Sequence, residues 1–206
     1  ITENSNMERY TARLKADYQA KKWLKVGANA GYANFTYNSL SADGQGNSSA
    51  NLFAFTSSVA PIYPLYVRDG QGNIMKNDAG ITMYDYGDGM NAGLTRPLLP
   101  NANGLADSRL NTDRSEGNAF NGTGFFDILF LKDFKFTFNV GVSLDETRRT
   151  TVQNPYFGQF ADENGIIGKY HTRDFSHNLQ QILNYTKVIG KHNVNVMLGH
   201  EYYQRR

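Results

Sequence analysis

The sequence has no cysteine, only 5 prolines and a single tryptophan among its 206 residues. Without cysteine, disulfide bonds and thiolate metal sites are excluded. No run of 18 or more apolar residues occurs, so a membrane-spanning helix is excluded as well. The net charge is only +2, and a field of one sign that would attract nucleic acid is therefore not expected.

Aromatic and turn-forming residues are plentiful instead. Tyrosine and phenylalanine occur 13 times each and glycine 20 times, whereas charged residues make up only 19%. This composition favours β-strands joined by many turns. Mean hydropathy is low, at −0.54, but a membrane β-barrel remains compatible with it because barrel strands expose apolar side chains on one face only.

Apolar and polar residues alternate with a period of two in several segments. The clearest run places Phe134, Phe136 and Phe138 on one face and Lys135, Thr137 and Asn139 on the other. Similar runs predict strands over residues of about 7–20, 23–37, 118–131, 134–147, 171–187 and 193–204. Paired through short turns, these strands would form three hairpins.

The connections between the expected strands are short and long in strict alternation. Turns near Lys21, Asp133 and Gly190 are short, whereas loops of about 38–117 and 148–170 are long. This alternation is typical of outer-membrane barrels, which have tight periplasmic turns and long extracellular loops. We therefore expect an all-β fold, an antiparallel transmembrane β-barrel segment of about six strands with long extracellular loops.

Six strands are too few for a barrel, because the smallest membrane barrels use about eight. The chain begins with Ile1, and both ends have strand-like sequence, so residues 1–206 are expected to be one part of a larger barrel domain. Outer-membrane lipid would contact the apolar face. The opposite, lumen-facing side would carry Arg13, Lys15, Asn29, Thr137 and Asn139.

No catalytic signature is present. The sequence has no G-x-S-x-G, H-E-x-x-H, P-loop or dinucleotide-binding motif, so we expect neither an enzyme nor a cofactor. The segments 69–73 and 85–89 are rich in Asp and Gly and leave calcium open as an alternative, but both lack the bidentate Glu of an EF-hand, and turn formation explains them without a metal.

The first long loop carries the most distinctive residues. Its run from Ala60 to Asp69 combines prolines, tyrosines and Arg68, a set that suits stacking on sugars or gripping a carboxylate. The expected contacts to substrate or partner are Tyr63, Tyr66, Arg68, Tyr84, Tyr86 and Arg96. The alternative is that these side chains pack the loop against itself, since a long loop needs an apolar anchor of its own.

At this loop the chain resembles the SusC/RagA family of TonB-dependent outer-membrane transporters of Bacteroidetes. The resemblance extends over nearly the whole chain. It is carried by the segments 9–27, Pro61-Ile62-Tyr63-Pro64-Leu65-Tyr66, 69–74, Tyr84-Asp85-Tyr86-Gly87, Arg96-Pro97 and the closing hairpin 192–201. The Pro-Ile-Tyr-Pro segment is the most specific of these, whereas the strand patterns would fit any large barrel.

The resemblance implies a barrel of 22 strands with an N-terminal plug. It further implies a SusD-like surface lipoprotein as a cap, energy supplied by TonB, and import of an oligosaccharide or peptide substrate across the bacterial outer membrane. The plug and the TonB-contacting region would lie outside this stretch, which would supply barrel wall and extracellular loops. The rival interpretation is a soluble or cell-surface β-sandwich, with Tyr63, Tyr66 and Arg68 as a ligand platform.

Overall fold

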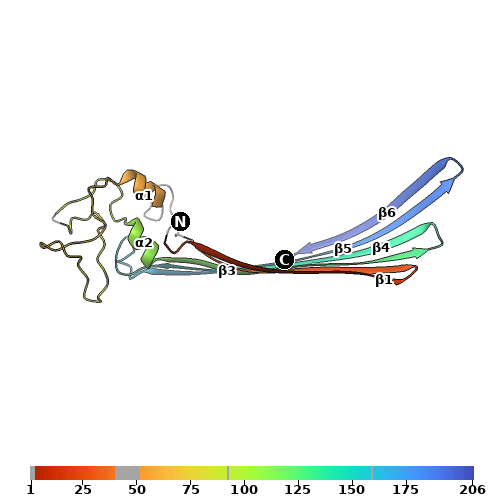
Figure 1. Cartoon of the computed structure of the whole chain (residues 1–206), viewed down its shortest axis with the longest axis horizontal. Helices are drawn as coiled ribbons and strands as arrows, with labels where there is room; N and C mark the ends of the chain where they lie inside the picture. Colours follow the sequence, from red (N-terminus) through yellow and green to blue (C-terminus); the bar gives the residue numbers. More distant parts are fainter. Residues whose placement is uncertain (1–2, 40–51, 92, 159) are drawn as a thin grey trace. The chain divides into compact units, whose positions relative to one another are not determined.

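The computed structural model describes residues 3–39, 52–91, 93–158 and 160–206. Figure 1 shows the long strands and the short helices. In chain order the elements are β1 (Asn6–Lys21), β2 (Leu24–Asn38), α1 (Leu52–Ser58), α2 (Gly104–Leu110), β3 (Thr112–Phe130), β4 (Phe134–Gln153), β5 (Ile166–Ile189) and β6 (His192–Arg205). Neither helix is long and apolar enough to cross a membrane.

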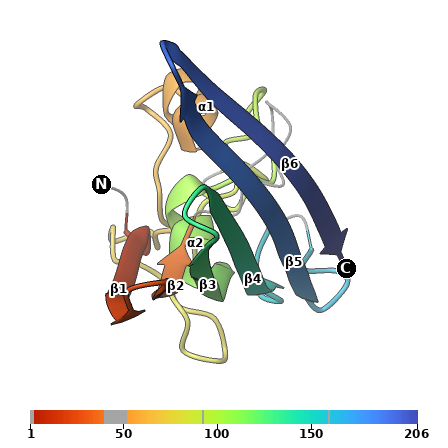
Figure 2. The same ribbon diagram turned by 90° about the vertical axis from the view of Figure 1, so that its right-hand side faces the viewer.

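All six strands belong to one antiparallel sheet in which every strand lies beside its neighbours in sequence. The order is β1-β2-β3-β4-β5-β6, and Figure 2 shows the strands following one another along a curved sheet. In the last hairpin, Leu183 lies opposite Leu198 and Tyr185 opposite Val196. The predicted all-β fold with hairpin-connected strands is confirmed.

The strands extend further toward the long loops than the alternation indicated. Strand β3 begins at Thr112 rather than near residue 118, β4 continues to Gln153, and β5 begins at Ile166. The second long connection is therefore 154–165 instead of 148–170. In the extensions of β3 and β4 both faces carry mostly polar residues, whereas that of β5 begins with Ile166-Ile167, which places an apolar residue on each face. In all three the contrast between apolar and polar positions that marks a strand is missing from the sequence.

The chain divides into two compact units. A loop unit comprises Ile1–Met7, Thr36–Ser115 and Arg149–Tyr170, and a strand unit comprises Glu8–Phe35, Glu116–Arg148 and His171–Arg206. The loop unit has a small aromatic core in which Tyr84, Tyr86 and Ala106 are buried. Around them pack Tyr66, Leu105, Leu110 and Phe157, so the two long connections share one core.

Helix α2 begins at a strong N-cap that the sequence analysis did not use. Asn103 has an extended backbone, and its side chain accepts hydrogen bonds from the N–H groups of Leu105 and Ala106. This satisfies donors that the first helical turn leaves without partners. In the sequence, an Asn followed by the apolar pair Leu105-Ala106 is a pattern that can predict such a helix start.

Candidate channel face and surface loop

One face of the strand unit is apolar and rich in aromatic rings. The ring of Phe126 stacks on that of Phe138 with centroids 5.2 Å apart, and the Phe134 ring lies 4.8 Å from that of Tyr185. These side chains belong to three neighbouring strands, so the aromatic contacts run across the sheet. On the outer strands of the same face the side chains of Leu14 and Leu198 are 72% and 71% exposed.

The opposite face carries a polar network. The Thr137 hydroxyl donates to Asp127 at 2.7 Å, and the Lys135 ammonium lies 3.0 Å from the other oxygen of that carboxylate. Further along, the Asn139 amide donates to Gln180 at 3.3 Å. On the last strand pair, Asn178 donates to Glu201 at 2.6 Å.

The structure places the residues predicted to face a lumen together on this polar side. Arg13, Lys15 and Asn29 are exposed there on β1 and β2, and Lys15 lies 3.8 Å from the Asp17 carboxylate. Thr137 and Asn139 are half-buried within the network. These residues therefore share one polar face, and their contact with a channel interior stays a prediction.

Two polar residues interrupt the apolar face on the last hairpin. Gln181 and His200 are partners across β5 and β6. His200 Nδ1 and Gln181 Oε1 are 2.6 Å apart, within hydrogen-bond distance of each other. Each of these two polar side chains thus has a partner on the otherwise apolar face.

In the loop unit, residues 66–84 fold back on themselves through isolated bridges. Tyr66 pairs with Tyr84, Arg68 with Ile74, and Lys76 with Thr82. The rings of Tyr66 and Tyr84 lie 5.4 Å apart, and the Tyr86 ring stacks on Phe157 at 6.1 Å. Burial raises the pKa of the Tyr86 hydroxyl well above its ordinary value. Tyr84 and Tyr86 are thus core residues of the loop.

Arg96 is also buried, with only 4% of its surface exposed. Its guanidinium donates to the carbonyl oxygens of Tyr86 at 3.1 Å and Leu99 at 2.9 Å, and to that of Ala102. It lies 5.3 Å from the centre of the Phe55 ring. Burial lowers the pKa of this guanidinium, although the nearby Asp85 carboxylate opposes that shift. The packing alternative therefore describes Arg96, Tyr84 and Tyr86 better than ligand contact does.

Tyr63, Tyr66 and Arg68 retain accessible surface. Arg68 is exposed and donates to the Gly72 carbonyl at 2.6 Å. Tyr66 is half-buried and its hydroxyl accepts from Arg109 at 3.2 Å. Of the side chains predicted to contact substrate or partner, these are the ones that an external ligand could reach.

The Asp-rich segments that suggested calcium use their carboxylates for turns. The Asp69 carboxylate accepts from the backbone N–H groups of Gln71 at 2.9 Å and Asn73 at 2.8 Å. The buried Asp85 carboxylate accepts from the Gly87 N–H at 2.8 Å and from the Asn91 amide. Among the residues that the structure describes, no group of three or more potential ligands could hold a metal ion.

Asn103 is the central residue of the loop unit and was missed by sequence reasoning. It is fully buried, and besides capping α2 its amide donates to the carbonyl oxygens of Leu65 and Asp85, both at 2.9 Å. Every hydrogen-bonding position of this side chain is used. Its partners are distant in sequence, so no local pattern could reveal them.

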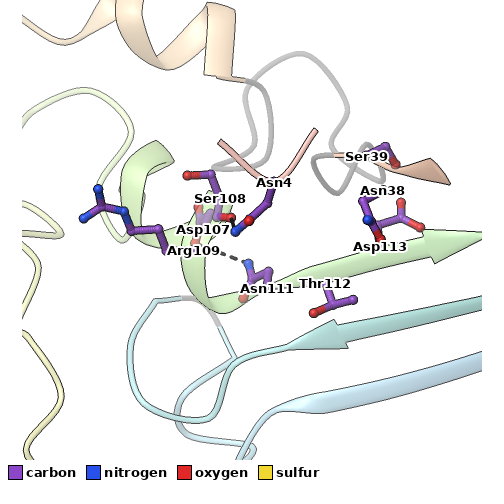
Figure 3. Close-up of a pocket in the computed structure, with 9 residues that line it drawn as sticks. All are labelled: Asn4, Asn38, Ser39, Asp107, Ser108, Arg109, Asn111, Thr112 and Asp113. Carbon is purple, nitrogen blue, oxygen red and sulfur yellow. Dashed lines mark hydrogen bonds between the residues drawn. The ribbon is translucent and has the colours of Figure 1, made fainter. Parts of the chain in front are cut away.

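A polar hollow of about 240 Å³ lies beside α2 in the loop unit. Figure 3 shows the side chains around it, with Asn4 directed toward Ser108 and Asn111 directed toward Asp107. Asn4 donates to the Ser108 carbonyl at 2.7 Å, and Arg149 holds Asp113 through two contacts of 2.7 Å. Hydrogen bonds within the loop unit thus occupy much of its lining.

No protein-family model matches the sequence, and no curated protein matches it either. Solved structures do. The RagAB peptide importer in its "closed-closed" state is similar with a TM-score of 0.69 and 24% identity. A second RagAB peptide transporter structure gives 0.67 and 23%, and the "open-open" state gives 0.63 and 23%.

The similarity covers 98% of this chain but only 20% or 21% of the RagAB chains. The chain thus spans about a fifth of their length. At this level of identity the likeness concerns the fold, and it includes both the strands and the loop unit because nearly every residue is aligned. The resemblance to SusC/RagA transporters is confirmed at that level: the chain has the fold of a barrel segment of a RagAB-type importer.

Proposed function

We propose that this chain is a wall segment, with its surface loops, of a TonB-dependent transporter of the SusC/RagA family in the bacterial outer membrane. The whole protein would import peptides or glycans together with a SusD-like lipoprotein. Peptides are favoured, because the structurally similar RagAB is a peptide importer. No catalytic role is assigned, since that relative is a transporter and the sequence has no catalytic motif.

The observation that carries the proposal is the chemical difference between the two faces of the sheet. One face presents aromatic and aliphatic side chains such as Tyr10 and Leu14, which are 68% and 72% exposed. The other presents the network around Asp127 and Asn139. A barrel wall between hydrocarbon and a wet interior requires this arrangement.

The sheet edges support a larger assembly. Within the described residues, β1 and β6 each have a strand neighbour on one side only. In a bilayer, unpaired backbone N–H and C=O groups cost several kcal/mol each, so both edges need partner strands. Further strands of the same protein would supply them and close the barrel.

The sandwich alternative needs a second layer over the apolar face. All six strands of the described part lie in a single sheet, and the apolar side chains of its outer strands are exposed. A soluble binding module of this kind would aggregate in water. If the chain were monomeric and folded in detergent-free buffer, the barrel proposal would be wrong.

The transport function is tested in cells that express the full-length protein. We expect uptake of a fluorescent peptide library that disappears when the transporter gene is deleted and returns with a plasmid copy. Uptake should also disappear when TonB is deleted, whereas surface binding of peptide should persist. Uptake that is unaffected by either deletion would overturn the proposal.

The accessible loop residues Tyr63 and Arg68 are proposed to contact the substrate or the lipoprotein. A variant with Tyr63→Ala and Arg68→Ala would remove side chains that do not belong to the buried loop core. We expect it to fold and to reach the membrane, but to retain less peptide or less lipoprotein in affinity purification. Retention equal to that of the wild type would exclude the role of these side chains.

A further inference from the structure

The polar face of the strand unit has a hollow of about 250 Å³ over β1, β2 and β3. Arg9, Thr11 and Arg13 line it from β1, Asn29 from β2, and Asn121 from β3. Because residues two apart point to the same side of a strand, the three β1 side chains rise from one face.

Small residues leave this hollow open. A Cβ at Gly31 would meet only the Arg13 side chain, at 3.8 Å, and the Asn121 carbonyl oxygen, at 3.9 Å. Ala33 and Ala119 line the hollow as well. Side chains of ordinary size at these positions would fill space that now remains beside the arginines.

The charge in this hollow is uncompensated within the described residues. Both Arg9 and Arg13 are exposed, no acidic residue lines the hollow, and neither guanidinium has an ion-pair partner in the part of the chain that the structure describes. The charge of the neighbouring Lys15 is compensated, because its ammonium lies 3.8 Å from the Asp17 carboxylate. Two guanidinium groups with hydroxyl and amide neighbours favour an anion with several acceptor atoms.

A second hollow on the same face provides a comparison. It has a volume of about 280 Å³ and is lined by Asn139, Asn178 and Gln180, with no charged residue. Positive charge is therefore not a general property of these hollows. Of these two hollows on the described sheet, the one that Arg9 and Arg13 line is the positively charged one.

We infer that the Arg9–Arg13 hollow binds carboxylate groups. The inference rests on the proposed function, in which the polar face borders the path of an imported peptide. The carboxylate could belong to that peptide or to an acidic side chain elsewhere in the same protein. Arg9 and Arg13 lie four residues apart on a strand, about 13 Å, so an extended chain with more than one carboxylate suits them best.

The test uses purified full-length transporter in detergent and two synthetic hexapeptides. One contains two glutamates and a free C-terminus, and the other has glutamine at those positions and an amidated C-terminus. Dissociation constants are measured for the wild type, for the double variant Arg9→Gln and Arg13→Gln, and for Lys15→Gln. The last is a control that removes one positive charge from the same strand face, where the double variant removes two, and does so at a site compensated by Asp17.

We expect the wild type to bind the acidic peptide about tenfold more tightly than the amidated one, as charge-assisted hydrogen bonds imply. The double variant should lose this preference and Lys15→Gln should keep it. If the carboxylate comes from the protein itself, the preference is unchanged, but the ligand-free double variant melts at a lower temperature than Lys15→Gln, and the difference shrinks at high salt.

The inference is overturned if the double variant matches Lys15→Gln both in peptide preference and in melting temperature. Failure of the proposed function looks different, because the wild type would then bind neither peptide. The melting comparison would still decide whether the hollow holds a carboxylate of the protein itself. Both arginines are exposed on the sheet, so the variants are expected to fold.

Discussion

Gly87 lies so close to Arg96 that a Cβ added at the glycine would be 2.6 Å from the Arg96 Cβ. Gly87 also has a φ of +73°, a conformation that other residues rarely adopt. This contact packs the 85–89 turn against the buried Arg96 side chain. The hydrogen bonds that the Arg96 guanidinium donates to backbone carbonyl groups hold the 96–102 segment in place.

Gly87→Ala should therefore destabilise the loop unit by about 2–4 kcal/mol, from backbone strain and displacement of Arg96. Gly72→Ala is the control, because Gly72 has a φ of +88° but nothing within 4 Å of its added Cβ. Hydrogen exchange of the loop amides in the full-length protein measures the stability loss of both variants. Equal effects of the two substitutions would mean that the Arg96 contact contributes nothing.

Substitution of Asn103 separates its two roles. Asn103→Asp keeps an acceptor for the N–H groups of Leu105 and Ala106 but cannot donate to Leu65 and Asp85. The buried Asp85 carbonyl loses the Asn103 amide, whereas the Leu65 carbonyl still accepts from the Asp85 N–H. We therefore expect a loss of about 1–3 kcal/mol, and Asn103→Ala should lose about 1 kcal/mol more. Faster hydrogen exchange over residues 65–110 is the readout. Wild-type protection in Asn103→Asp would show that the two donated bonds are dispensable.

The apolar face should reject charge and the polar face should accept it. Phe138 stacks on Phe126, so Phe138→Lys should cost about 2–4 kcal/mol in a bilayer, the amount found for Lys near the midplane of barrels. The neighbouring Asn139→Lys should be tolerated. Urea unfolding of the full-length protein in lipid vesicles compares the two, and similar losses of stability would contradict the assignment of the faces.

The turn at Asp69 should loosen in acid. Hydrogen bonds from Asn73, first from its side chain and then from its backbone, lower the pKa of the Asp69 carboxyl below 3.8. The stabilisation is fully present above that ordinary pKa and is lost as the pH falls through the lowered value in the folded loop. Hydrogen exchange of the Gln71 and Asn73 backbone amides should therefore accelerate as the pH falls through the lowered pKa of Asp69. Asp69→Asn should remove this pH dependence. An unchanged acid response in Asp69→Asn would assign it to another group.

Strand positions were predictable because the two faces of each strand meet different surroundings. A strand between apolar and polar surroundings has apolar and polar residues in alternation, and the segment from Phe134 to Asn139 alternates at every position. Where β3 begins, at Thr112, and where β4 ends, at Gln153, both faces are polar, so nothing in the local sequence marks these positions.

Roles within the loop unit could not be predicted in the same way. Arg96 and Tyr86 have the residue types of a ligand site, but contacts with Phe55 and Phe157 bury them. Whether an aromatic or arginine side chain is exposed depends on such distant contacts, which a single sequence does not contain. The half-buried Tyr63 and the exposed Arg68 have the same residue types and a different environment.

The order of the sheet affects how the chain folds. Within the described sheet every strand pairs with those before and after it in sequence, so a hairpin such as β5-β6 can complete its inner hydrogen bonds without strands from elsewhere in the chain. The pairing of β2 with β3 must instead close the long connection between Asn38 and Thr112, a slower step because closing a long loop costs entropy. The three hairpins can therefore form first and join edge to edge afterwards.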